Sequence, residues 1–308
     1  MMEERPRVIA VMGPTAVGKS GLALQLAKEL DAEVVNADSV QVYRHLEIGT
    51  AKPTPAERAE VRHHLLDIVD PAEDFDVGRY NLLARAVIRD LGRRGRPAIV
   101  VGGTGLYLKV LFHGLVPGPA CNEQVRRRLR SEAGREGCAG LYQRLAQVDA
   151  PTAERLHPHD VFRIIRALEV WECTGRPLSE LQREHGFQER PFRTLELGLH
   201  RPRAELYDRI NRRIDAMMAR GFLKEVTELL ARGYGPHLKS MQSLGYRHLV
   251  QHLMDQVPLS EALQAMKRDT RHYAKRQMTW FRRNPEIHWF GPEELESIAR
   301  IARQFVEH

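Results

Sequence analysis

The stretch GPTAVGKS, residues 13–20, decides the fold class of this chain. It matches the pattern G-x-x-x-x-G-K-[ST], with Lys19 and Ser20 as its last two residues. An apolar run at 8–12 precedes it and leucines at helical spacing follow it, which is the strand–loop–helix context that such a match requires. The loop amides, the helix N-terminus and the lysine can hold phosphate oxygens, and the serine hydroxyl can ligate Mg²⁺. The loop therefore predicts a site for a diphosphate or a polyphosphate.

Short apolar runs recur along the first hundred residues and again later in the chain. Continuous runs of this kind are typical of parallel strands that are covered on both faces. With the helical patterns between them, they predict an α/β fold: a P-loop core with a doubly wound parallel sheet. The expected strands lie at 8–12, 33–37, 64–69, 98–101, 194–200 and 287–290.

The strand signals vanish between residues 117 and 190, where short helical patterns are broken by Gly and Pro. We therefore expect three parts: the first part of the P-loop core at 1–116, a helical insertion at 117–190, and the second part of the core with basic C-terminal helices at 191–308. The length of 308 residues, above the usual size of a single domain, agrees with this division.

Composition narrows the class of protein. The net charge of +7 fits a polyanionic partner, although a basic enzyme of small acidic metabolites is also possible. The sequence shows neither a membrane span nor a signal peptide. Cys121, Cys138 and Cys173 lie far apart without a C-x-x-C pair, which argues against a zinc site or a disulfide framework. We expect them to be packing residues in a reducing cytoplasm.

Polar stretches follow three of the expected strands: the phosphate loop, Asp38–Gln41 and Gly102–Tyr107. Ligands collect at the carboxyl ends of strands in open α/β sheets, so we expect these stretches to form one site. Asp38 is the candidate acid, although it could instead cap the segment that follows it. Thr104 lies between two glycines, which suits either a close approach to a ligand or a tight turn.

A basic helix is expected from Ser260 to about Arg283. Segment 267–283 carries seven Lys/Arg against one Asp, with aromatic residues between them. Cations interleaved with aromatics favour single-stranded RNA, whose bases stack while its phosphates pair; a solvated helix face is the alternative. Segments 126–130 and 162–166 add further cations from the insertion. The cations expected along one side of the basic helix are Arg268, Arg271, Lys275 and Arg282.

Together these stretches resemble the bacterial tRNA dimethylallyltransferase family, also called isopentenyl-diphosphate:tRNA transferases. The resemblance runs from about residue 7 to residue 290. Its departures, at Val40, His45, Glu47 and Phe162, do not touch the proposed catalytic groups. The matching text is GPTAVGKS (13–20), NADSVQVYRHLEIGTAKP (36–53), HHLLDI (63–68), VVGGTGLYLK (100–109), FRIIRALEVWECTGRP (162–177), QSLGYRH (242–248) and TRHYAKRQMTWFRR (270–283).

The resemblance implies a reaction: transfer of the dimethylallyl group from dimethylallyl diphosphate to N6 of adenosine 37 in tRNA. ATP is then not the substrate. Asp38 is implied as the acceptor of the N6 proton, with Thr104 and Lys19 completing the catalytic set. Mg²⁺ is expected on Ser20 and the diphosphate. The implied diphosphate-binding residues are Gly13, Pro14, Thr15, Ala16, Val17, Gly18, Lys19, Ser20 and Arg213, with Arg212 as an alternative to Arg213.

The same resemblance implies where tRNA binds. By default we expect a cytoplasmic monomer with no membrane contact. The basic helix adds Arg271 and Lys275 to the tRNA-binding residues. The residues that the resemblance implies are Asp38, Ser39, Val40, Gln41, Thr104, Arg126, Phe162, Arg163, Ile164, Ile165 and Arg166.

Three alternatives stay open at this point. A P-loop kinase or NTPase would transfer or release phosphate from ATP, but the chain has no N-K-x-D motif, and the strand at 98–101 ends in glycines rather than an Asp. An RNA-binding protein with a vestigial loop is disfavoured by the intact Lys19, Ser20 and Asp38. An enzyme that prenylates free adenine nucleotides would not need the basic helix or the insertion.

Overall fold

The computed structural model describes residues 5–116, 118 and 122–308. Pro117, where the insertion was expected to begin, and Cys121 lie outside the described residues. The chain divides into two compact units. The core unit comprises Met1–Phe112 with Arg190–His308, and the helical unit comprises His113–Glu189.

The core unit is built on a six-stranded sheet in the order β3-β2-β4-β1-β5-β6, in which every strand pair is parallel. The expected α/β class with a parallel sheet is thus confirmed. The central strand is β1, whose Ala10 pairs with Val100 on one side and Glu196 on the other. The strands are β1 (Arg7–Met12), β2 (Glu33–Asn36), β3 (His63–His64), β4 (Ala98–Gly102), β5 (Arg193–Leu199) and β6 (His288–Phe290).

The strand expected at 64–69 is wrong over most of its length. Strand β3 ends at His64, because Leu65 and Asp67 adopt left-handed backbone angles, with φ of 61° and 56°. Such angles cannot continue a pleated strand. Val69 makes only an isolated bridge to Tyr43, so the segment crosses the sheet edge as a loop.

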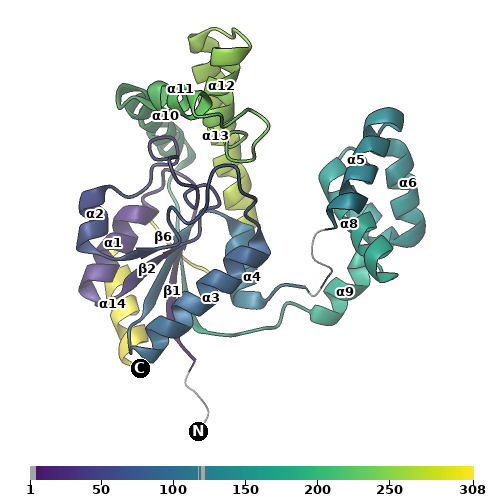
Figure 1. The fold of residues 1–308 in the computed structure, drawn as a ribbon. Coiled ribbons are helices and arrows are strands. Elements are labelled where there is room, and N and C mark those ends of the chain that lie inside the picture. Colours follow the sequence, from purple (N-terminus) through teal and green to yellow (C-terminus); the bar gives the residue numbers. More distant parts are fainter. Residues whose placement is uncertain (1–4, 117, 119–121) are drawn as a thin grey trace. The chain divides into compact units, whose positions relative to one another are not determined.

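Helices cover both faces of the sheet, with α1 and α14 together on one face and α3 on the other (Figure 1). Helices α10 to α13 pack against one another beyond the edge where the phosphate loop lies. The basic helix was expected to begin near Ser260, and α13 begins one residue earlier. The helices of the core unit are α1 (Lys19–Glu29), α2 (Pro55–Glu60), α3 (Val77–Arg93), α4 (Gly105–His113), α10 (Arg203–Ala219), α11 (Phe222–Ala231), α12 (Tyr246–Met254), α13 (Leu259–Phe281) and α14 (Leu295–Glu307).

The helical unit contains helices only, as far as its residues are described. It has a separate core, in which Leu129, Leu145, Ile164 and Leu168 are fully buried. A second core of this kind lets the unit bury its own apolar side chains independently of the sheet. Its helices are α5 (Glu123–Glu136), α6 (Cys138–Val148), α7 (Ala150–Arg155), α8 (Val161–Thr174) and α9 (Leu178–His185).

Among the described residues, no helix has the length and apolar character that crossing a membrane would need. Cys138 and Cys173 are free thiols, and Cys173 is exposed. The expectation of a packing role is therefore wrong for Cys173.

Candidate active site

The phosphate loop leaves the carboxyl end of β1 and ends at the first turn of α1. Gly13 and Gly18 have φ of 141° and 119°, which residues with a side chain rarely adopt. A Cβ on Gly13 would also lie 2.6 Å from the carbonyl oxygen of Leu199 on β5. The two glycines therefore allow the chain to turn tightly while the loop amides face one side.

Two arginines far along the chain, Arg209 on α10 and Arg201 just before it, hold the loop by its carbonyl oxygens. Arg209 Nε donates to the Ala16 carbonyl oxygen at 2.9 Å, and Arg201 Nε donates to the Val17 carbonyl oxygen, also at 2.9 Å. Sequence reasoning missed both arginines. The only available signal was that Arg209 lies one helical turn before Arg213 on the same expected helix.

Lys19 is enclosed by the site. Its Nζ donates to the Pro14 carbonyl oxygen at 2.8 Å, so the side chain curls over its own loop. Burial and then the nearby Arg213 charge lower the pKa of Lys19 to about 7, against the opposing effect of Asp38. This ammonium group lacks a full counter-charge, and an anion in the loop would supply one.

The structure distinguishes Arg213 from Arg212. Arg213 Nη1 lies 3.4 Å from the Thr15 hydroxyl and lines the cavity described below. Burial lowers the pKa of Arg213 from its usual value, while Asp38 opposes this shift. Arg212 is exposed and forms an ion pair with Asp208 on its own helix. Both arginines line a hollow beside Gly18, Lys19 and Ser20, but of the two only Arg213 also lines the cavity that contains Asp38.

Asp38 follows β2. Its side chain accepts hydrogen bonds from nearby backbone amides and also lines the cavity. Its Oδ1 accepts hydrogen bonds from the amides of Val40 (2.8 Å) and Gln41 (3.3 Å). Its own amide donates to Asn36 Oδ1 at 3.1 Å. The capping role considered above is therefore real, but it does not exclude a chemical role, because Asp38 lines the same cavity as Lys19.

Thr104 follows β4, the strand between β2 and β1. Its Oγ1 accepts a hydrogen bond from the Ser39 amide at 3.1 Å. The hydroxyl group of Tyr273 on α13 also interacts with Thr104, and burial raises the pKa of Tyr273 to about 12. Thr104 does not itself line the cavity; it meets the site through Ser39 and Tyr273, both of which do.

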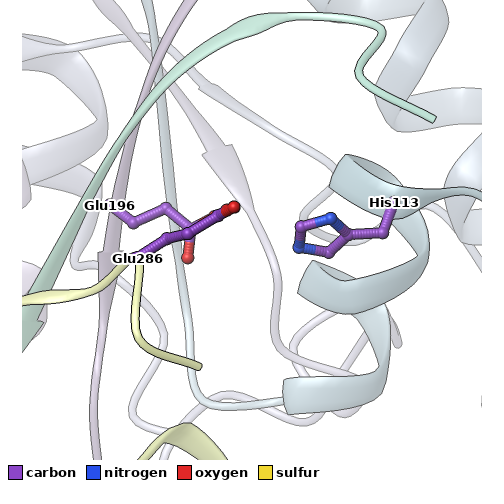
Figure 2. Close-up of side chains that lie close together, drawn as sticks. All are labelled: His113, Glu196 and Glu286. Carbon is purple, nitrogen blue, oxygen red and sulfur yellow. The ribbon is translucent and has the colours of Figure 1, made fainter. Parts of the chain in front are cut away.

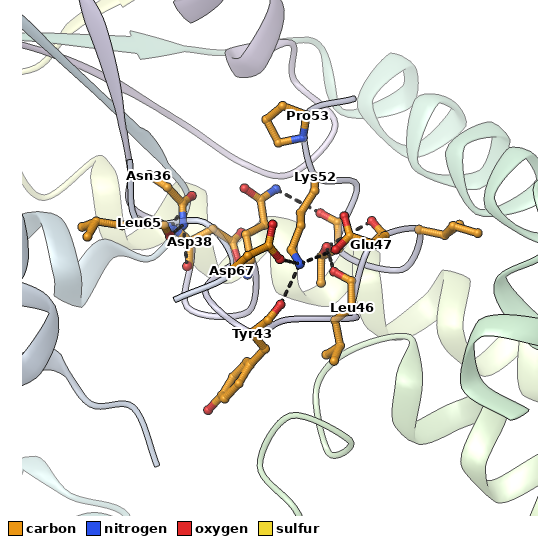
Figure 3. Close-up of polar contacts among 12 residues, drawn as sticks. Asn36, Asp38, Tyr43, Leu46, Glu47, Lys52, Pro53, Leu65 and Asp67 are labelled. Carbon is orange, nitrogen blue, oxygen red and sulfur yellow. Dashed lines mark hydrogen bonds and ion pairs between the residues drawn. The ribbon is translucent and has the colours of Figure 1, made fainter. Parts of the chain in front are cut away.

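Lys52, which lies near the end of the segment 38–53, holds this segment in place through its buried side chain (Figure 3). Lys52 Nζ donates to the Tyr43 carbonyl oxygen at 2.6 Å and pairs with Glu47 at 2.9 Å and with Asp67. Arg58 Nη1 reaches the same Asp67 carboxylate at 2.7 Å. Four charges thus fix a segment that has little regular secondary structure.

Glu225 on α11 fixes the tip of the same segment. Its carboxylate accepts hydrogen bonds from the amides of Glu47, Ile48 and Gly49 at 3.1, 2.7 and 3.2 Å. A Cβ on Gly49 would lie 2.2 Å from the Phe222 ring, so the tip packs directly against α11. Sequence reasoning missed Glu225, because the contact joins residues far apart in the chain.

These loops enclose a cavity of about 480 Å³ within the core unit. Its lining includes most of the polar residues expected at the site. It also includes the apolar side chains of Ile210, Ile214, Met217, Phe222 and Met266. A cavity of this size and mixed lining suits a small amphipathic ligand. The residues expected to bind diphosphate or tRNA that line it are Thr15, Ala16, Lys19, Ser20, Asp38, Ser39, Val40, Gln41 and Arg213.

One face of α13 forms a second, more open hollow of about 410 Å³, which we call the α13 groove. Trp280, 40% exposed, packs against Gly105, where a Cβ would lie only 2.3 Å from the indole. Lys275 lines the groove, whereas Arg271 donates to Asn211 Oδ1 at 2.9 Å and stacks over Tyr207. The groove is lined by His272, Lys275, Arg276, Thr279, Trp280 and Arg283.

Comparisons with known proteins identify the family. The family described as IPP transferase matches residues 41–284, and the family described as Isopentenyl transferase matches residues 6–70. The chain belongs to the IPP transferase family. Membership makes it a prenyltransferase and confirms the family expected from the sequence motifs.

Two curated relatives carry the name tRNA dimethylallyltransferase. The one from Syntrophobacter fumaroxidans is 56% identical over 298 residues, covering 96% of this chain and 87% of the relative. The one from Desulfosudis oleivorans is 51% identical over 305 residues, covering 99% and 97%.

Solved structures give the same result. The full-length tRNA isopentenylpyrophosphate transferase of Bacillus halodurans has a TM-score of 0.74 at 37% identity, covering 98% of this chain and 97% of that one. A eukaryotic dimethylallyltransferase acting on tRNA has a TM-score of 0.81 at 32% identity, covering 93% and 74%.

Within the helical unit, the residues expected to contact tRNA divide into surface and core. Phe162 is 73% exposed, whereas Ile164 and Ile165 are buried in the core of the unit. The expectation is therefore corrected for these two isoleucines, because their side chains hold α8 in place. Arg126 and Arg166 share the buried Glu169, at 3.0 and 2.7 Å.

A separate acidic group lies away from the phosphate loop. Figure 2 shows Glu196 on β5 and Glu286 before β6, whose carboxylate oxygens lie within 4.8 Å of each other. Asn284 Nδ2 donates to Glu196 at 2.7 Å. Burial and then the Glu286 charge raise the pKa of Glu196 to about 7.

Proposed function

We propose that the chain transfers the dimethylallyl group from dimethylallyl diphosphate to N6 of adenosine 37 in tRNA, releasing diphosphate. The observation that supports this most is the single cavity that Lys19, Asp38 and Arg213 share. It combines cations for a diphosphate, a carboxylate for a proton, and apolar side chains for a prenyl tail. The curated relatives are named for this transfer to tRNA.

In the proposed reaction, the N6 amine attacks C1 of the dimethylallyl group as the bond from C1 to the diphosphate oxygen breaks. The amine must lose a proton, which Asp38 accepts as the general base. The Val40 and Gln41 amides hold the Asp38 carboxylate in one orientation through Oδ1. We assign Thr104 the task of orienting the acceptor base, with its hydroxyl held by Ser39 and Tyr273.

The leaving diphosphate gains negative charge, which the site residues would stabilise. Lys19, Ser20 and Arg213 line the cavity in which the diphosphate is proposed to lie. Mg²⁺ fits this site, because the Ser20 hydroxyl lines the cavity beside the position proposed for the diphosphate oxygens and Mg²⁺ prefers oxygen ligands. When bound, the ion would neutralise charge on the diphosphate.

The five-carbon tail is proposed to lie against the apolar part of the lining. Ile210, Ile214 and Met217 come from one face of α10, and Phe222 begins α11. Burial of an apolar chain is favourable at about 25 cal/mol per Å², so these side chains would contribute affinity as well as exclude water.

We assign tRNA binding to two surfaces. In the core unit it is the α13 groove, where Lys275, Arg276 and Arg283 flank the exposed Trp280. In the helical unit it is the face that carries Phe162 and Arg163, with Arg126 and Arg166 anchored on Glu169. Cations with exposed aromatics are the combination that binds unstacked loop bases and their phosphates.

We propose that the protein acts as a monomer, in the cytoplasm with its tRNA substrate. The test uses purified protein, Mg²⁺, labelled dimethylallyl diphosphate and an unmodified tRNA with A37. Label on N6 of adenosine after nucleoside digestion, lost when A37 is replaced, is the expected result. ATP turnover without transfer to a competent tRNA would instead support a kinase or NTPase.

A further inference from the structure

Gln277 joins two loops of the site. It lies on α13, and only 6% of it is exposed. Its Oε1 accepts a hydrogen bond from the Thr15 amide at 2.9 Å, and its Nε2 donates to the Gly103 carbonyl oxygen at 2.8 Å. One side-chain amide thus bonds to the phosphate loop after β1 and to the loop after β4 that carries Thr104.

The sheet alone does not fix these loops relative to each other. Strands β1 and β4 pair only as far as Met12 and Gly102, and the two loops leave the sheet immediately afterwards. Beyond that point, Gln277 is the side chain that hydrogen-bonds to both loops among the described residues. Its two hydrogen bonds therefore hold Thr15 and Gly103 at a set distance from each other.

Because Gly103 has no side chain, the Gln277 amide can occupy the space beside it. A Cβ at position 103 would lie 2.2 Å from Gln277 Nε2. The next atom of another residue, the Gly13 carbonyl oxygen, would be 3.6 Å away, which is an ordinary contact. Gly103 is also not among the glycines with positive φ. Alanine at this position would therefore displace the Gln277 amide and disturb little else.

Tyr273 lies one helical turn before Gln277 and interacts with both Thr104 and Gln277. The same face of α13 therefore contacts the phosphate loop, the Gly103 carbonyl and the Thr104 side chain. A helix is a rigid element, so these three contacts keep a fixed spacing.

We propose that Gln277 is a positioning residue for prenyl transfer: it sets the distance between the loop that holds the diphosphate and the loop beside which the acceptor amine reacts. This inference rests on the proposed function above. A misplacement of about 1 Å between reacting groups can lower a rate on the order of 10²-fold without removing either binding site.

The test compares Gln277→Met, Gly103→Ala and the double variant, with Gln264→Met as the matched control at an exposed position of α13. Single-turnover transfer to tRNA is measured with enzyme in excess, so that product release does not limit the rate. Affinities for inorganic diphosphate with Mg²⁺ and for tRNA are measured alongside, together with the melting temperature.

We expect each single variant to lower the single-turnover rate by about 10- to 100-fold. The double variant should be no slower than the slower single variant by more than about twofold, because both changes break the same link. The diphosphate and tRNA affinities should stay within about threefold, and Gln264→Met should behave as the unchanged protein. Gln277→Glu keeps the acceptor for the Thr15 amide and should retain part of the rate.

Other outcomes overturn the proposal. A Gln277→Met rate within twofold of the unchanged protein would remove the positioning role while leaving the proposed function intact. Losses that multiply in the double variant would show that the two residues act separately. A loss of rate matched by an equal loss of diphosphate affinity or of folded protein would make Gln277 a binding or structural residue. An unchanged protein that transfers no prenyl group would overturn the proposed function and this inference with it.

Discussion

Lys19 and Pro14 close the phosphate loop on itself, because the Lys19 Nζ donates to the Pro14 carbonyl oxygen at 2.8 Å. The ammonium group is thereby buried beside Arg213, and its pKa falls to about 7. Two cations held together without a full counter-charge are costly to a folded protein. A bound anion would therefore offset the electrostatic repulsion between Lys19 and Arg213 that the free protein carries.

This arrangement predicts proton uptake when diphosphate binds. At pH 8 most free protein carries a neutral Lys19, whereas the anion should restore its charge, so binding should take up close to one proton per site. Diphosphate affinity should therefore fall as the pH rises above about 7. Calorimetry with inorganic diphosphate and Mg²⁺ in buffers of different ionisation enthalpy measures the uptake.

The control for this experiment is Lys19→Arg, whose side chain stays charged throughout the range. The difference in proton uptake between the two proteins isolates Lys19 from the titration of the diphosphate itself. Equal uptake by both proteins would contradict the prediction.

Replacement of Asp38 should separate its chemical role from its structural one. Asp38→Asn keeps an oxygen that can accept from the Val40 and Gln41 amides, but it removes the base. We expect single-turnover transfer to fall on the order of 10²-fold or more with tRNA affinity kept. Asp38→Ala should lose the rate and loosen the loop as well. A near-normal rate in Asp38→Asn would rule out the carboxylate as the base.

The α13 groove should account for part of the salt dependence of tRNA binding. Lys275→Gln and Arg276→Gln each remove a groove cation, so each should weaken binding and reduce the slope of log affinity against log salt by about 0.7 to 0.9. Arg271→Gln serves as the comparison, because Arg271 is engaged with Asn211 and Tyr207. Filter binding over a range of salt concentrations measures the slopes. An unchanged slope for Lys275→Gln would mean that the groove faces solvent and does not bind tRNA.

Glu196 should make stability depend on pH. Its carboxyl titrates near 4.5 in an unfolded chain, whereas its pKa is about 7 in the folded protein, chiefly through burial and then through Glu286. Asn284 and Arg190 oppose this shift. Between these pH values the folded state keeps a proton that the unfolded state has lost. The free energy of unfolding should therefore fall as the pH rises from 4.5 to about 7.

Glu196→Gln removes this titration and can still accept from Asn284. Above pH 7 we expect it to be more stable than the unchanged protein by up to about 3 kcal/mol, with the difference vanishing near pH 4.5. Urea unfolding at pH 5 and pH 8 measures both proteins. A difference that does not change with pH would mean that Glu196 is ionised in the folded state.

Local patterns in the sequence were sufficient for five of the six strands and for many of the residues that line the cavity. The strand at 8–12, the glycines of the loop and the polar residues after each strand carry their information in neighbouring positions. The carboxyl ends of parallel strands lie at one edge, so Asp38 after β2 and Lys19 after β1 line one cavity although β4 separates their strands. The strand expected at 64–69 was wrong, because the apolar pattern of the sequence does not reveal the left-handed backbone angles of Leu65 and Asp67.

Only the tertiary structure decided which distant side chains reach the site. Arg209 and Arg201 hold loop carbonyls, Glu225 holds three amides of the segment 38–53, and Gln277 bonds to residues more than 170 positions away. Such contacts depend on how helices pack beyond the sheet, which no spacing within a helix reveals. The sequence by itself determined the parallel α/β class, the phosphate loop and the charge of the chain, because these follow from local chemistry. The packing of α10, α11 and α13 decided how the site is closed and which cations face it.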